Sequence, residues 1–96
     1  MSAYVVVNCE VTEPVRYEQY KLVAAAAVAQ YGGRYLARGG TTAVLEGSWQ
    51  PKRVVILEFP TLAAATDFHQ SPEYRAARAI RIGAASMDVI AIEGVT

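Results

Sequence analysis

Three short segments of this chain are apolar at almost every position, and no other feature restricts the fold as much. They contain the runs Tyr-Val-Val-Val (4–7), Val-Val-Ile-Leu (54–57) and Val-Ile-Ala-Ile (89–92). Their short length and β-branched residues favour strands. Successive side chains of a strand point to opposite faces, so both faces of the resulting sheet are apolar. Each face needs a cover, because a large exposed apolar face is rare on a soluble monomer.

Segments with helical periodicity lie between the strands. Residues 15–31 carry an apolar stripe at three- and four-residue spacing, which is typical of an amphipathic helix. A second helix is expected from residue 62 to about residue 70, with Thr61 as its N-cap. Ser71 followed by Pro72 then supplies a new N-cap and a proline at the first helical position, so this helix breaks and restarts, running to about residue 82.

The order of the expected elements predicts the fold. Residues 34–38 and 41–46 are expected to form one strand interrupted by Gly39-Gly40, paired as a hairpin with a strand at residues 52–59. With the strands expected at residues 3–9 and 86–93, the order is β-α-β-β-α-β. This order predicts an α+β, ferredoxin-like sandwich: a four-stranded antiparallel sheet with two helices on one face. We expect a single domain over residues 1–96.

The helices of such a sandwich cover one face of the sheet only. The positions of the second face are also apolar, broken only by Asn8, Glu58 and Asp88. A second copy of the chain, placed sheet to sheet about a two-fold axis, is the simplest cover. The sequence therefore predicts a homodimer, in which Trp49 either contacts the partner or anchors its own loop.

Composition excludes several classes of function. Nine basic residues balance nine acidic ones, so the basic excess of a nucleic-acid-binding protein is absent. The longest apolar stretch, residues 22–29, is far shorter than the roughly 20 residues that span a membrane. Cys9 is the only cysteine, which excludes an intrachain disulfide or a multi-cysteine metal site and fits a cytoplasmic protein. We expect no metal and no cofactor.

Several motifs together resemble one family. They are Gly-Gly-Arg-Tyr-Leu-Ala-Arg-Gly-Gly (32–40), Leu-Glu-Gly (45–47), residues 54–60, Ser-Pro-Glu-Tyr (71–74) and Arg81. They resemble domain-of-unknown-function family 1330 of the dimeric α/β-barrel superfamily, over nearly the whole chain. The resemblance implies a ferredoxin-like protomer that pairs sheet to sheet. Relatives in the superfamily include cofactor-free monooxygenases, lactone isomerases and haem enzymes. This chain has Phe68-His69-Gln70 where the family often has two aromatic residues.

Two residues are candidates for moving a proton. His69 is the only histidine, and it is either a general base at the helix break or a residue that ends a helix. Glu58 is a lone carboxylate in an apolar strand. It either forms a salt bridge with an arginine, for which Arg38 and Arg81 are favoured over Arg34, or has a raised pKa and acts as a base.

The candidate binding residues are Arg38, Arg81 and Tyr74. Arginine holds a carboxylate or enolate in a bidentate geometry, although Arg38 and Arg81 also suit pairing with Glu58, Asp88 or Glu46. Tyr74 either donates a hydrogen bond into a cleft or packs its helix on the sheet. We expect any ligand pocket to lie between the sheet and the broken helix, near Ser71.

Two functions are consistent with these residues. The first is a cofactor-independent enzyme, monooxygenase- or isomerase-like, acting on a small acidic or enolisable metabolite, in which Glu58 or His69 moves a proton. The second is a non-catalytic, homodimeric ligand-binding or stress-related module. A solvent-connected pocket of about 300 Å³ or more, lined by Glu58, Arg38 or His69, favours the enzyme, and a filled interior favours the module.

Overall fold

The order of elements is the predicted one. The computed structural model describes residues 1–96. Its elements are β1 (Ala3–Val11), α1 (Pro14–Gln30), β2 (Arg34–Arg38), β3 (Arg53–Phe59), α2 (Leu62–Gln70), α3 (Pro72–Arg81) and β4 (Ala85–Glu93). Helices α2 and α3 are the two halves of the second predicted helix. The fold is the ferredoxin-like α+β sandwich expected from the sequence.

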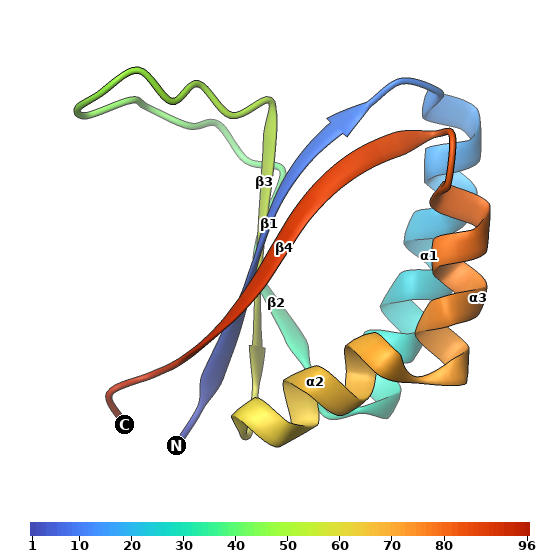
Figure 1. Cartoon of the computed structure of the whole chain (residues 1–96), viewed down its shortest axis with the longest axis vertical. Helices are drawn as coiled ribbons and strands as arrows, with labels where there is room; N and C mark the ends of the chain where they lie inside the picture. The colour runs from blue at the N-terminus through green and yellow to red at the C-terminus, as the bar shows by residue number, and fades with distance from the viewer.

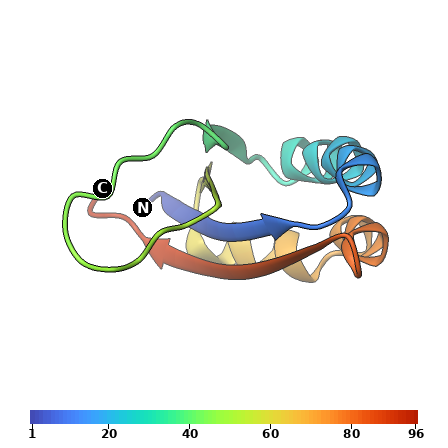
Figure 2. The ribbon, with the colours of Figure 1, turned by 90° about the horizontal axis from the view of Figure 1, so that it is seen from above.

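The strands form one antiparallel sheet in the order β2-β3-β1-β4. Helices α1 and α3 lie side by side on one face of this sheet, and α2 crosses near the end of β3 (Figure 1). Seen from above, the same two helices again lie next to each other, on one side of the strands (Figure 2). The four strands therefore have a covered face, called here the inner face, and an uncovered outer face.

The core lies between the inner face and the helices. Its strand residues are the ones predicted from alternation, and Val5, Leu57 and Phe59 are all buried. Helix α1 contributes residues of its predicted stripe, including the buried Tyr17 and Tyr20. These residues belong to one continuous cluster, so a single core holds both layers together.

The outer face is apolar and exposed. Ile90 and Ile92 of β4 expose 61% and 56% of their surface, and Ile56 of β3 is only half-buried. No helix of the chain reaches this face (Figure 1). The predicted division of the strands into two apolar faces is therefore confirmed.

Local chemistry explains the break between α2 and α3. The Thr61 hydroxyl accepts a hydrogen bond of 3.0 Å from the Ala64 amide at the start of α2. The Ser71 hydroxyl accepts one of 3.0 Å from the Tyr74 amide at the start of α3, and it donates to the Phe68 carbonyl at 2.7 Å. Ser71 is thus bonded both to the end of α2 and to the beginning of α3. The two predicted N-caps, Thr61 for α2 and Ser71 for α3, are confirmed.

The predicted strand at residues 41–46 is wrong. Residues 39–52 form a loop that projects from the sheet on the side away from α1 and α3 (Figures 1 and 2). Gly39 adopts a φ of +72°, which turns the chain out of the sheet just after its amide donates to the Val54 carbonyl. Beyond that turn nothing pairs with the chain, and Leu45 exposes 94% of its surface.

Gly33 provides a test of core packing. A Cβ atom at this position would lie 2.6 Å from Cε1 of Phe59 and 2.9 Å from Cγ1 of Val28. Because Phe59 is completely buried, we expect Gly33→Ala to destabilise the fold by about 1–3 kcal/mol through overpacking. Gly40→Ala is the matched control, since a Cβ there meets nothing within 4 Å. Urea unfolding of both variants measures the difference, and equal stabilities would contradict this account.

Candidate active site

An irregularity in β2 decides where Arg38 points. Tyr35 lies opposite Leu57 and Arg38 lies opposite Val55, with a β-bulge between Tyr35 and Ala37. In a regular strand, residues three apart lie on opposite faces. The extra residue of the bulge brings both side chains to the inner face. The Arg38 guanidinium accordingly stacks on the Tyr35 ring, 4.2 Å from its centroid.

A narrow pocket opens at this point, between the inner face and the helices. The cavity measures about 40 Å³. The cavity itself is thus smaller than the size expected for a ligand pocket. Its walls are mainly apolar, formed by residues such as Val5, Leu57 and Phe68. Among the predicted site residues Arg38, His69 and Tyr74 line it, and the amide of Tyr74 is bonded to Ser71.

His69 lies in the last turn of α2 and is half-buried. Arg78 of α3 donates a hydrogen bond of 2.8 Å to the His69 carbonyl, and the same nitrogen lies 3.2 Å from Nδ1 of the ring. Burial, together with the nearby charges of Arg78 and Arg81, lowers the pKa of His69 below its ordinary value. The imidazole is therefore neutral near pH 7 and able to accept a proton.

Tyrosine side chains form the polar part of the pocket wall. The hydroxyls of Tyr20 and Tyr74 are 2.8 Å apart and share a hydrogen bond. Burial raises the pKa of Tyr20 strongly and that of Tyr17 to about 12, so both are neutral near pH 7. Tyr74 also packs against the rings of Phe68 and His69, with centroid distances of 4.8 and 5.1 Å. Both predicted roles of Tyr74, packing and presenting a hydroxyl to the pocket, are thus compatible.

Basic residues lie around the pocket, and no acidic residue does. Lys21, Arg38 and Arg53 belong to its lining. Arg53 was not among the sequence-based candidates, because it stands at the polar start of a strand. The alternation of side chains along the strand could have identified it. Arg53 lies two residues before Val55 and therefore points to the same inner face. Its Nε donates a hydrogen bond of 3.2 Å to the Tyr17 hydroxyl.

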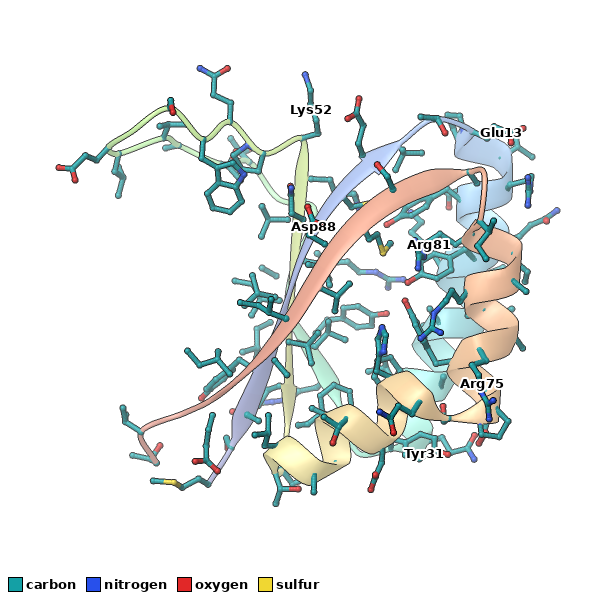
Figure 3. The ribbon with its side chains drawn as sticks, in the orientation of Figure 1. Glu13, Tyr31, Lys52, Arg75, Arg81 and Asp88 are labelled. Carbon is teal, nitrogen blue, oxygen red and sulfur yellow. The ribbon has the colours of Figure 1, made fainter.

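Arg81 points from α3 into the layer between the helices and the sheet, whereas Arg75 points away from it (Figure 3). The Arg81 guanidinium lies 5.9 Å from the centroid of the Tyr20 ring. Its Nε is buried without a hydrogen-bond partner. Arg81 thus lies behind the tyrosines and not in the pocket lining.

Glu58 lies on the outer face, away from His69. It is the cross-strand neighbour of Arg34, whose Nε donates to the Glu58 carboxylate at 2.6 Å. The prediction of a pair with Arg38 or Arg81 is therefore wrong, and the third candidate, Arg34, is the partner. The hydrogen bond from Arg34 holds the pKa of Glu58 below its usual value, contrary to the alternative of a raised pKa. The two predicted proton-transfer residues are not brought together.

Asp88 and Trp49 meet at a second hollow. Asp88 lies opposite Asn8 on the outer face, and both residues line a polar depression of about 320 Å³ together with Trp49 from the loop. The Trp49 side chain remains 62% exposed. The loop thus extends along the uncovered side of the sheet.

Comparison with known families assigns the chain to one of them. Residues 2–95 match the model of the family described as "Domain of unknown function (DUF1330)", and the chain belongs to this family. No curated protein matches the sequence. No helix of the structure is long and apolar enough to cross a membrane.

Solved structures share the fold at low sequence identity. A protein of unknown function from Rhodopseudomonas palustris has a TM-score of 0.75 at 20% identity, covering 99% of this chain and 83% of that one. SnoaB, a cofactor-independent oxygenase from Streptomyces nogalater, has a TM-score of 0.69 at 14% identity, covering 99% and 94%. A dimeric ferredoxin-like protein of unknown function from Jannaschia sp. has a TM-score of 0.70 at 14% identity, covering 98% and 100%.

The Arg34–Glu58 pair predicts a pH-dependent stability. Because the folded state lowers the pKa of Glu58, the pair contributes stability at pH values above the ordinary carboxyl pKa, and this contribution is lost as the pH falls through the lowered pKa. We expect Glu58→Gln to lower the melting temperature slightly at pH 7, and the difference from the wild type to shrink steadily as the pH falls below the ordinary carboxyl pKa. Thermal melts over a series of pH values test this, and a difference that stays constant or grows towards acid pH would refute it.

Proposed function

We propose that the chain is a cofactor-independent enzyme acting on a small acidic or enolisable metabolite. One observation carries this proposal: a neutral imidazole and an arginine, His69 and Arg38, line the same apolar pocket, although they come from distant elements. The pairing of a base with a cation is what the formation of an enolate requires. The free Cys9 suits a cytoplasmic enzyme.

The reaction begins with proton abstraction from carbon. The C–H bond next to a carbonyl breaks, its proton moves to a ring nitrogen of His69, and the electron pair moves onto the carbonyl oxygen. Arg38 at the mouth stabilises the negative charge, and the Tyr74 hydroxyl donates a hydrogen bond to the substrate. Arg81 does not reach the substrate directly. Its guanidinium lies beside the ring of Tyr20, and Tyr20 shares a hydrogen bond with Tyr74, so Arg81 influences the Tyr74 hydroxyl through Tyr20. We assign the base to His69 and not to Glu58, which lies on the other face of the sheet.

Proton abstraction can be tested without knowing the product. A thermal-shift screen of small carboxylic and keto acids identifies ligands, and proton NMR in D₂O then follows loss of their α-hydrogens. We expect the wild type to catalyse this exchange and His69→Gln to lose about 10²-fold or more of the rate. Because the pKa of His69 is lowered, the rate should persist below pH 6.5 and fall only at lower pH.

Arg78 and Arg75 give a matched pair for this test. Arg78→Gln removes a neighbouring charge and should shift the acidic fall of the rate towards higher pH, whereas Arg75→Gln, whose side chain points away (Figure 3), should leave the profile unchanged. Exchange that is equal in His69→Gln and the wild type would contradict the proposal.

The narrow cavity supports a second candidate, a non-catalytic binding module. A cavity of about 40 Å³ holds only a few water molecules, so a ligand must lie largely at the mouth unless the walls move. This function predicts ligands in the thermal-shift screen but no exchange of their hydrogens by any form of the protein.

We also propose that two copies of the chain pair through their outer faces. Exposed isoleucines on β4 and the half-buried Ile56 on β3 form an apolar surface that the chain's own helices do not cover. Solved proteins of similar fold, such as the one from Jannaschia sp., are described as dimeric. The loop at residues 39–52 extends on the same side of the sheet (Figure 2). Its Trp49 shares a hollow with Asn8 and Asp88 of the outer face, so we expect Trp49 to contact the partner.

Assembly is tested by sedimentation. We expect a dimer at micromolar concentration that buries about 1,200 Å² or more. Ile90→Lys should give aggregated or unfolded protein, or weaken the dimer, because it places a charge in the interface. Val15→Lys is the control, since Val15 lies on α1 and is 78% exposed. Fluorescence of Trp49, the only tryptophan, should shift to longer wavelength on dilution, and a stable monomer of the wild type would contradict the proposal.

A further inference from the structure

Arg38 and Arg53 are neighbours on the inner face of the sheet. Arg38 lies opposite Val55 in the β2–β3 register, and Arg53 precedes Val55 by two residues on the same strand. Diagonal neighbours of this kind lie about 7–8 Å apart at their backbones, within reach of two long side chains. Both side chains line the pocket, and Arg38 is the more exposed of the two.

Neither guanidinium has a carboxylate to neutralise it. The salt bridges of the chain use Arg16, Lys21 and Arg34. Arg53 donates through Nε to the Tyr17 hydroxyl, which is neutral near pH 7. Arg38 makes only a long hydrogen bond of 3.5 Å, to the Lys21 carbonyl. Two adjacent cations with free N–H donors repel each other, and an anion bound between them would relieve that repulsion.

Gly39 makes room for this arrangement. A Cβ atom on Gly39 would overlap the Arg53 guanidinium. The glycine therefore lets Arg53 lie directly against the backbone next to Arg38. Gly40 differs, because a Cβ there meets no atom within 4 Å. A side chain at Gly39 would therefore displace Arg53 from its observed position, whereas a side chain at Gly40 would not.

From this geometry we propose that Arg38 and Arg53 form an anion anchor that holds the carboxylate of a small apolar acid, and that Gly39 is the residue that admits Arg53 to it. The proposal rests on the proposed function and specifies its substrate class. The carboxylate binds at the mouth, and the hydrocarbon part points towards the apolar wall that includes Leu57 and Phe68. The small volume of the cavity favours a compact, flat group.

Benzoate and its neutral isostere benzamide are the probes. Titrations followed by protein NMR measure the affinity of each for the wild type and for the variants. We expect benzoate to bind at least about tenfold more tightly than benzamide, because charge-assisted hydrogen bonds to the two arginines are lost with the amide. Arg53→Gln and Arg38→Gln should each weaken benzoate binding by about tenfold or more, and Arg75→Gln should leave it unchanged.

Gly39→Ala tests the positioning of Arg53. We expect it to weaken benzoate binding by displacing the Arg53 guanidinium, and to weaken binding less in Arg53→Gln than in the wild type, while the positive φ of Gly39 also makes the alanine variant less stable. Gly40→Ala should bind like the wild type. Thermal melts establish that each variant is folded at the titration temperature. An additive effect of Gly39→Ala and Arg53→Gln would show that the glycine acts in another way, which overturns its assigned role.

Failure of the anchor can be told apart from failure of the proposed function. Equal affinity for benzoate and benzamide, no benzoate binding at millimolar concentration, or wild-type affinity in Arg53→Gln would overturn the anchor. Exchange that depends on His69 with a neutral ketone would then still support the enzyme. Conversely, benzoate binding that depends on Arg53, without any exchange, would retain the anchor and leave the binding module as the function.

Discussion

The alternation of side chains across a sheet that is covered on one face governs the rest of this structure. Each strand residue either enters the layer beneath the helices or faces outward, and its neighbour takes the opposite side. Leu57 is therefore buried in the core while Glu58 lies outside, bonded to Arg34. By the same rule Arg53 reaches the pocket. The chemical type of a strand residue alone does not show which face it takes, because both faces of this sheet are apolar.

The pocket depends on one departure from that alternation. Without the bulge between Tyr35 and Ala37, Arg38 would lie on the outer face and the pocket would lose a cation. A bulge is tolerated here because β2 is an edge strand, whose second side has no partner to disturb. From the sequence the interruption was expected at Gly39-Gly40, a few residues too late. Gly39 instead ends the strand and directs the loop away.

The parts of the fold that follow from local chemistry were predictable. Thr61 and Ser71 cap their helices as expected, since an N-cap depends on residues within one turn. The parts that depend on which strands pair, and in which register, were harder to predict from the sequence. Residues 41–46 have the composition of a strand but no neighbour to bond with, and Glu58 binds the arginine that register places opposite it. His69, Tyr74 and Arg38 were identifiable as candidates, whereas their common pocket required the register of β2.

The two faces of the sheet are joined by the segment that follows β2. Arg38 lies at the pocket mouth, Gly39 turns the chain, and the loop that begins there extends along the outer side to Trp49. A partner that covers this loop in the proposed dimer would hold the segment that begins at Gly39. Because Gly39 fits closely against the Arg53 guanidinium, an ordered loop would also restrict the proposed anion anchor. Assembly through the outer face would then favour a pre-organised binding site on the inner face.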